Sequence, residues 1–337
     1  MKNKLITLIA LAVLIAGMMS LAGCGEKAEE EAKLSGKVKI ACLNGPTGMG
    51  LVDLMDNEDY GIKVYQAPTD VLPAIIKGDV DFACVPSNLA AVLYNKTKGK
   101  VTCVSPMVKG VLHILGNGVE AESLKDLKGK TIVASGQGGT PEYALQVVLE
   151  ANGLKMGKDV KVEWLANHAD VAAKLMKNKG AVAMLPEPFV STVLTKGKDK
   201  VADLFDMNEL WSDATSQDFP MGVLIARTEF VTERAEDLKI VLSDIKASID
   251  DVNTASDEVA QKIVDNGFLA DPEIAKKAIP NCSLCLYSDE DGGNSLAAGA
   301  DIMKTFNETM FKASPKSVGG KLPGEDLYLT AYPVVEK

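Results

Sequence analysis

Two stretches of the chain share one order of features: an apolar strand pattern, a glycine-rich turn and an apolar helix pattern. In the first stretch, residues 36–55, the apolar positions Val38, Ile40 and Cys42 alternate and predict a strand. The segment Asn44–Gly50 interrupts this two-residue alternation, and apolar residues then recur at the three- and four-residue spacing of a helix. A helix that begins at such a turn leaves unpaired backbone N–H groups where a ligand can approach them. This stretch therefore predicts half of a binding site.

The second stretch, residues 130–153, repeats this order. It predicts a strand over Thr131–Ala134, a turn over Gly136–Pro141 and a helix. Thr140 is expected at the helix N-cap and Pro141 at the first helical position, where its missing N–H loses no hydrogen bond. Because each stretch presents a helix start, the pair predicts two lobes with a ligand cleft between them.

Strands and helices alternate along most of the chain, which predicts an α/β fold with a mixed, mostly parallel sheet in each lobe. Further strands are expected at Asp81–Val85, Val101–Val104, Val111–Leu115, Val160–Leu165, Ala181–Leu185 and Met221–Ala226. From Thr232 onward the pattern is helical, with an apolar stripe at Ala235, Leu238, Leu242, Ile245, Ile249 and Val252. Ligands of such sheets bind at the carboxyl ends of the strands, where the glycine turns are expected.

The length of 337 residues suits two domains. We expect the chain to cross between lobes at Gly116–Val119 and to return between Val201 and Pro220. The first lobe would then comprise residues 37–118 and 219–337, and the second lobe, inserted between them, residues 119–218.

The N-terminus has the pattern of a secretory signal. Lys2 and Lys4 precede an apolar run, residues 5–19, that is shorter than the roughly 20 residues needed to span a membrane. The following Leu-Ala-Gly-Cys, ending at Cys24, resembles the bacterial lipoprotein box. Residues 1–23 are therefore predicted to be a lipoprotein signal peptide, Cys24 the lipidated residue, and residues 24–36 a charged tether. The alternative is a transmembrane anchor.

The charge pattern limits the classes of partner. The net charge of −10 argues against nucleic-acid binding, and the arginines, Arg227 and Arg234, lie far from both turns in the sequence. With only two histidines, His113 and His168, the sequence supports no Ser–His or Cys–His catalytic arrangement. His113, inside an apolar strand, is expected to be structural, and His168 is expected at the surface more than in the cleft.

Five cysteines follow Cys24, and an odd number cannot pair completely. Cys282 and Cys285 resemble a redox or metal motif, but their segment predicts a strand, in which residues three apart face opposite sides. We therefore predict buried free thiols and no metal site.

The motifs together resemble a known family. The lipoprotein box, KIACLNGPTGMGLVDLM at Lys39, DLKGKTIVASGQGGTPEYAL at Asp126, LPEPF at Leu185 and SPKSVGGKLP at Ser314 are similar to bacterial solute-binding lipoproteins of ABC importers. The resemblance is to the nitrate/sulfonate/thiamine-precursor-like group and covers the whole mature chain. It implies the two-lobed periplasmic-binding-protein type II fold.

The resemblance also implies a function and its partners. The protein would be extracytoplasmic, anchored to the cell membrane by lipid on Cys24, and monomeric. It would capture a small organic or oxyanion solute between its lobes and deliver it to the permease subunits of an ABC importer. No cofactor, metal or catalysis is implied.

Ligand contacts implied by the resemblance come from both turns and three neighbouring segments. They are Asn44, Gly45, Pro46, Thr47, Gly48, Met49, Ser87, Asn88, Gln137, Gly138, Gly139, Thr140, Glu187 and Pro188. Thr47, Ser87 and Thr140 could instead serve only as helix caps, and Glu187 could brace the hinge. Tyr65, Trp211 and Phe219 could stack on a planar ligand or simply pack in the core.

Two other functions remain open on the sequence. Enzymes of menaquinone- and pyrimidine-precursor pathways share this fold, but they are cytoplasmic, which the signal peptide opposes. A ligand sensor without a transport role is the other alternative.

Overall fold

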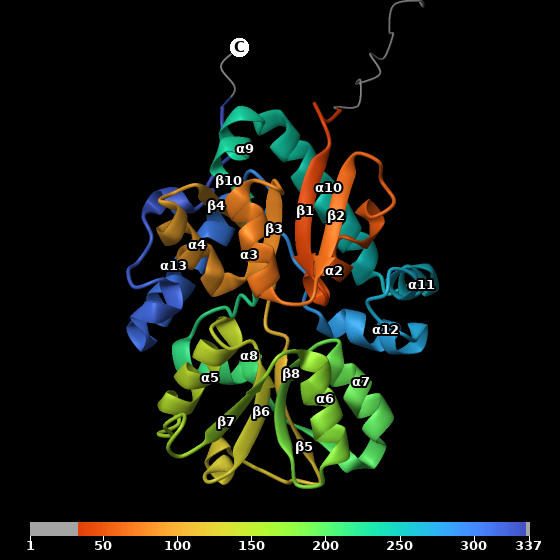
Figure 1. The fold of residues 1–337 in the computed structure, drawn as a ribbon, viewed down its shortest axis with the longest axis vertical. Helices are drawn as coiled ribbons and strands as arrows, with labels where there is room; N and C mark the ends of the chain where they lie inside the picture. The colour runs from red at the N-terminus through yellow and green to blue at the C-terminus, as the bar shows by residue number, and fades with distance from the viewer. Residues whose placement is uncertain (1–32, 335–337) are drawn as a thin grey trace, which may run out of the picture. The chain divides into compact units, whose positions relative to one another are not determined.

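Two five-stranded sheets form the framework of the computed structural model, which describes residues 33–334 (Figure 1). We call each sheet with the helices packed on it a lobe. The predictions made for residues 1–32, including the signal peptide and the lipidation of Cys24, lie outside the described residues.

The first sheet has the strand order β2-β1-β3-β10-β4. Its strands are β1 (Val38–Leu43), β2 (Tyr60–Tyr65), β3 (Phe82–Pro86), β4 (Val101–Val108) and β10 (Gly222–Arg227). Strand β1 pairs in parallel with β2 and β3, whereas β10 lies antiparallel between β3 and β4. Strand β10 therefore comes from a segment that begins more than a hundred residues after the end of β4 in the sequence.

The second sheet has the equivalent order β7-β6-β8-β5-β9. Its strands are β5 (Leu112–Asn117), β6 (Thr131–Ser135), β7 (Lys161–Leu165), β8 (Val182–Pro186) and β9 (Val201–Asp206). Strand β6 pairs in parallel with β7 and β8, and β5 runs antiparallel to β8 and β9. The two mixed sheets flanked by helices confirm the predicted fold class.

Helices flank both sheets. In the second lobe, α6 (His168–Lys177) and α7 (Phe189–Gly197) pack together against the sheet, and α5 (Thr140–Ala151) packs with α8 (Met207–Thr215) on the other side (Figure 1). The other helices are α2 (Pro46–Met49), α3 (Pro68–Lys77), α4 (Ser87–Thr97), α9 (Thr228–Glu233), α10 (Ala235–Asn253), α11 (Asp257–Asp265), α12 (Pro272–Ala278) and α13 (Leu296–Ala313). Short 3₁₀ helices are η1 (Val52–Leu54), η2 (Leu124–Leu127), η3 (Lys198–Lys200), η4 (Ile279–Asn281), η5 (Pro315–Val318) and η6 (Glu325–Leu327).

The first crossing between sheets lies earlier than predicted. Strand β4 ends in the first sheet at Val108, and β5 begins in the second sheet at Leu112, so Lys109–Val111 makes the crossing. The prediction at Gly116–Val119 is wrong because those turn residues mark the end of β5, not a change of sheet. Residues from Leu34 onward form one compact unit, so the division into two movable lobes stays our proposal.

The return crossing lies inside the predicted range. Strand β9 still belongs to the second sheet, and α8 with the segment after it leads back to β10. Trp211 and Phe219 stack on each other here, with ring centroids 4.8 Å apart, and both are almost fully buried. They pack in the core and do not reach the cavity described below.

The C-terminal helices contact both lobes. Every residue of the predicted apolar stripe of α10 is buried, which confirms that prediction. In addition, α12 contacts α7 and α13 contacts α5, so these helices do not pack on the first lobe alone. All helices among residues 33–334 are too short or too polar to cross a membrane.

The segment around Cys282 and Cys285 is not the predicted strand. It makes a single isolated bridge, between Leu284 and Val108, because the positive φ of 47° at Ser283 interrupts the extended backbone. The five cysteines of the described chain are free thiols, and burial raises the pKa of each one.

Candidate functional site

A cavity of about 500 Å³ lies where the carboxyl ends of strands from both lobes meet. The first lobe contributes Leu43, Asn44, Gly45, Pro46, Thr47, Gln66, Ala67, Pro68, Thr69, Leu72, Val85, Pro86, Leu89, Val108, Met221 and Gly222. The second lobe and the crossing contribute Val111, Leu112, Ser135, Gly136, Gln137, Gly138, Gly139, Pro141, Leu165, Ala166, Asn167, His168, Pro186, Glu187 and Phe189. The volume is large enough for a small organic solute.

Eight of the residues proposed from the sequence line this cavity, and six do not. Those that line it are Asn44, Gly45, Pro46, Thr47, Gln137, Gly138, Gly139 and Glu187. Those that do not are Gly48, Met49, Ser87, Asn88, Thr140 and Pro188. Both glycine turns therefore meet at one cavity, while the residues just beyond them turn into the core or toward the other lobe.

The turn between β1 and α2 brings the backbone to the cavity wall. Gly45 has φ 153° and ψ −158°, a conformation that a side chain would strain, and α2 begins directly after it. Gly48 faces inward, since an added Cβ would lie 2.4 Å from Phe268 Cε1. Met49 is fully buried. The first turn thus presents Asn44–Thr47 to the cavity and hides the rest of α2.

The turn before α5 is engaged by the other lobe. Gly139, not Thr140, is the N-cap, so the predicted cap is wrong by one position. The Thr140 hydroxyl instead donates to Asn88 Oδ1 at 3.2 Å and accepts from the Asn88 backbone N–H at 3.3 Å. Asn88 Nδ2 also donates to the Gly138 carbonyl at 3.4 Å. Asn88 and Thr140 join the lobes to each other instead of lining the cavity.

Ser87 is not the cap that the sequence analysis considered. Pro86 is the N-cap of α4, and Ser87 is its first residue. The Ser87 backbone N–H donates to the carbonyl of Met221, the residue just before β10, at 3.2 Å, which fixes the helix start against the sheet. Its hydroxyl is fully buried without a hydrogen-bond partner.

Glu187 is a buried acid at the start of α7. Its side chain is 2% exposed and accepts hydrogen bonds from the Ser191 N–H (3.0 Å) and the Ser191 hydroxyl (2.9 Å). Burial raises the pKa of Glu187, although the hydrogen bonds from Ser191 act in the opposite direction. The carboxyl group therefore accepts hydrogen bonds from the first turn of α7 and forms part of the cavity wall.

His168 reaches the cavity, contrary to the surface position expected from the sequence. Its Nδ1 lies 2.6 Å from the Ser135 hydroxyl oxygen, and its ring centroid lies 5.5 Å from that of Phe189. Burial lowers the pKa of His168 to about 4, so the imidazole is neutral at neutral pH. The Asn167 N-cap after β7 was the sequence signal for this placement, because it starts α6 at the carboxyl end of a strand.

The Ser135–His168 contact joins a serine and a histidine that the sequence analysis had not paired. A pKa of about 4 makes this imidazole a weak base at neutral pH. The nearby Gly138 and Gly139 N–H groups already donate to Glu142 Oε2 (2.6 Å) and the Gly136 carbonyl (3.0 Å). These two N–H groups are therefore not free to act as oxyanion-hole donors.

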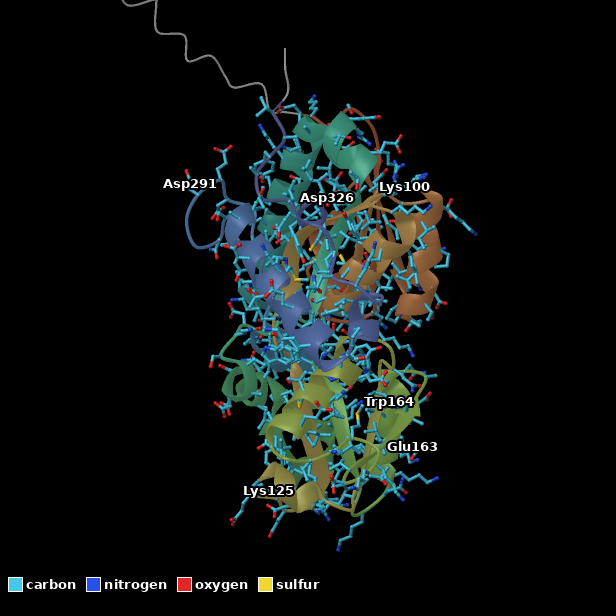
Figure 2. All side chains as sticks on the ribbon, turned by 90° about the vertical axis from the view of Figure 1, so that its left-hand side faces the viewer. Lys100, Lys125, Glu163, Trp164, Asp291 and Asp326 are labelled. Atoms are coloured by element: carbon cyan, nitrogen blue, oxygen red, sulfur yellow. The ribbon has the colours of Figure 1, made fainter. Side chains whose placement is uncertain are left out.

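The cavity wall is mostly apolar and carries little charge. Glu187 and His168 are its titratable side chains within the described part of the chain. Charged side chains such as Lys125 and Asp291 lie instead on the outer surface (Figure 2). Lys109 lines a separate hollow of about 320 Å³ at the crossing, where its Nζ lies 3.9 Å from Asp218 Oδ1. Among residues 33–334, no group of His, Cys, Asp and Glu side chains is placed to hold a metal ion.

Comparison with known proteins gives one family match. A family model described as ABC transporter, phosphonate, periplasmic substrate-binding protein matches residues 57–268, more than half of the chain. No curated protein sequence gives a significant match.

Solved structures of similar fold cover nearly the whole chain. An ABC transporter structure from Parabacteroides distasonis is 21% identical, with a TM-score of 0.70 over 87% of this chain and 98% of that one. The periplasmic aliphatic sulphonate binding protein SsuA from Escherichia coli is 16% identical, with a TM-score of 0.66 over 89% and 94%. The alkanesulfonate-binding protein SsuA from Xanthomonas axonopodis pv. citri, bound to MOPS, is 15% identical, with a TM-score of 0.63 over 88% and 98%. At these identities the likeness is one of fold: the periplasmic-binding-protein fold predicted from the sequence.

Proposed function

Because the chain belongs to the family of phosphonate ABC-transporter periplasmic substrate-binding proteins, we propose that it captures its solute in the cavity between the two lobes. It is the extracytoplasmic substrate-binding component of an ABC importer. Proteins of this class bind a small ligand and deliver it to permease subunits. The family assignment does not favour the alternative of an enzyme with this fold.

The observation that carries the proposal is that one cavity takes its wall from both glycine turns. Asn44–Thr47 comes from the first lobe, and Gln137–Gly139 comes from the second lobe. A solute held there touches both lobes at once, so it stabilises the closed arrangement over any arrangement in which the lobes part. The segments Lys109–Val111 and Ser216–Met221 connect the lobes and would carry the motion.

The proposed ligand contacts are the lining residues of the two turns together with Glu187. Thr47 and Gln137 supply neutral hydrogen-bonding groups, and Phe189 supplies an aromatic face. The aromatic residues Trp211 and Phe219 are excluded from this role because they are buried against each other.

The membrane attachment is proposed from the sequence. Cys24 would carry the lipid, residues 24–36 would tether the folded part, and the protein would act as a monomer.

A ligand sensor would use the same cavity as a transport protein. Association with an ABC permease would distinguish the transport role from the sensor role.

The proposal predicts that filling the cavity abolishes ligand binding. Ala166 lies on the cavity wall and is exposed, so Ala166→Trp adds bulk there without disturbing the core. Ala169, three residues along, is also exposed but does not line the cavity, so Ala169→Trp is the matched control. Protein-free yeast extract should raise the melting temperature of the wild type and of Ala169→Trp by several degrees, and should leave Ala166→Trp unchanged. A shift that persists in Ala166→Trp would place binding elsewhere.

A further inference from the structure

We propose that the solute of this cavity carries a bulky apolar body, which lies against apolar strand ends next to the crossings between the lobes. The inference rests on the proposed function and names the substrate class of the same site. It follows from which strands supply the polar and the apolar side chains of the cavity wall. A phosphonate that carries an aromatic or a long aliphatic group has this form, whereas inorganic phosphate and small, wholly polar solutes do not.

The apolar part of the wall comes from the strands nearest the crossings. Strands β3, β10 and β4 adjoin one another in the first sheet, and β8 and β5 adjoin in the second. Six apolar side chains from the cavity ends of these strands, the first crossing and the start of α4 form what we call the floor: Val85, Leu89, Val108, Val111, Leu112 and Met221. None of the six is more than 9% exposed.

The polar side chains of the wall come from the remaining strands. Within the described part of the chain, every polar lining side chain except Glu187 belongs to β1, β2, β6 or β7, or to the turns and helix starts after them. Gln66, Thr69, Gln137 and His168 are among them. Helices α3 and α6 also begin at lining residues of these turns, and a helix start favours an anionic group. The polar groups of a solute therefore find their partners on these turns and not on the floor.

Glu187 is the exception, and its carboxyl group is engaged by its own helix. Oε1 accepts from the Ser191 hydroxyl at 2.9 Å, and Oε2 accepts from the Ser191 N–H at 3.0 Å. Because the residue is also almost fully buried, it presents little polar surface to a solute. The part of the wall nearest the crossings therefore stays apolar in spite of this acid.

An apolar floor favours an apolar body because water lying against it is released when the body binds. Each methylene that is buried raises the affinity roughly fourfold. A cavity of about 500 Å³ also has room for such a body beside a compact polar group. A small polar solute would leave the floor in contact with water and gain no affinity from it.

The test separates solutes by their apolar surface without requiring the ligand to be known. Protein-free yeast extract is passed over octadecyl silica in dilute acid. The unretained polar solutes and the methanol eluate are dried, dissolved at neutral pH and assayed separately for a rise in melting temperature. We expect the eluate to raise the melting temperature of the wild type, the unretained solutes to leave it unchanged, and the rise to be lost in Ala166→Trp.

The other outcomes separate the inference from the proposed function. A rise produced by the unretained solutes and lost in Ala166→Trp would overturn the inference and leave the proposed function intact. A rise from the eluate that survives Ala166→Trp, or no rise from either fraction, would count against both.

A second variant tests the floor itself. Met221→Gln keeps the length of the side chain and places an amide on the floor, so half of the maximal shift should require at least tenfold more eluate than in the wild type. Met156→Gln is the matched control, because Met156 is partly buried and does not line the cavity, and it should respond as the wild type does. A wild-type response from a folded Met221→Gln would overturn the inference. If Met221→Gln does not fold, Val111→Thr makes the same test with a side chain of nearly unchanged shape, and it should weaken the response in the same direction.

Discussion

At the scale of single residues, the two histidines of the chain differ in what their ring nitrogens contact. His113 Nδ1 lies 2.8 Å from Asp203 Oδ2, and although burial alone lowers its pKa, the hydrogen bond and charge of Asp203 raise it above 6.5 overall. His168 has a neutral serine hydroxyl as its partner, so burial dominates and lowers its pKa to about 4. At mildly acidic pH the imidazole of His113 is therefore a cation, whereas the imidazole of His168 in the cavity wall is neutral.

We expect the imidazole NMR signals to show this difference directly. Because the chain has only two histidines, one signal should titrate above pH 6.5 and the other near pH 4. His168→Gln should remove the signal that titrates near pH 4. Two signals that titrate together near pH 6.5 would contradict the lowered pKa of His168.

The low pKa of His168 also predicts how stability depends on pH. In the folded protein its pKa is about 4, compared with 6.5 for an unperturbed histidine. Between these values the unfolded chain binds more protons than the folded chain, so stability falls as pH is lowered from 6.5 to 4. Since one pKa unit corresponds to about 1.4 kcal/mol, the contribution is at most about 3–4 kcal/mol. Urea unfolding of the wild type and His168→Gln across this range should show a smaller loss in the variant.

At the scale of elements, the β1–α2 turn depends on glycine for close packing as well as for its backbone angles. A Cβ at Gly48 would lie 2.4 Å from Phe268 Cε1 and 2.7 Å from the Leu43 carbonyl oxygen. The carbonyl cannot move away without displacing β1. The close approach of α2 to β1 therefore requires a residue without a side chain at this position.

We expect Gly48→Ala to lower the free energy of unfolding by about 1–3 kcal/mol, because it overpacks this contact. Gly61→Ala is the matched control. Gly61 lies in the edge strand β2, where a Cβ would meet the flexible Lys37 side chain at 3.3 Å. Its effect should stay within about 0.5 kcal/mol. Equal unfolding midpoints in urea for the two variants would show that α2 can shift to make room.

At the scale of the whole described unit, polar contacts hold the two lobes together beside the cavity. Asn88 and Thr140 exchange two hydrogen bonds and are both fully buried. The Thr309 hydroxyl of α13 also donates to Gln217 Oε1 of the connecting segment at 3.0 Å. These contacts stabilise the arrangement in which both glycine turns face one cavity.

Removing the Asn88–Thr140 contact should reveal this coupling. Thr140→Val should lower the free energy of unfolding by about 1 kcal/mol, and Asn88→Ala by more, because it also leaves the Ser317 carbonyl without its donor. The double variant should lose less than the sum, since both changes remove the same hydrogen bonds. Thr305→Val is the control, because its hydroxyl bonds only within α13, and its effect should add to that of Asn88→Ala. Strict additivity for Asn88 and Thr140 would contradict a direct interaction.

The sequence predicted correctly the features that depend on residues close together in the chain. Glycine turns, the apolar stripe of α10 and most strands depend on neighbours within a few residues, and the structure places them as predicted. The predicted caps at Ser87 and Thr140 were wrong, because their hydroxyls lie against other parts of the fold. The crossing at Gly116–Val119 was wrong for a related reason: a strand pattern does not say which sheet the strand joins.

By itself, the sequence determined the class of fold, the two glycine turns and the absence of arginine near them, because these are local patterns or composition. The tertiary structure alone decided which residues meet. It brought His168 to the cavity, paired Glu142 with the Gly138 N–H and turned Asn88 and Thr140 toward each other. The physical reason is that burial, hydrogen-bond partners and charge states depend on contacts between segments that are far apart in the sequence.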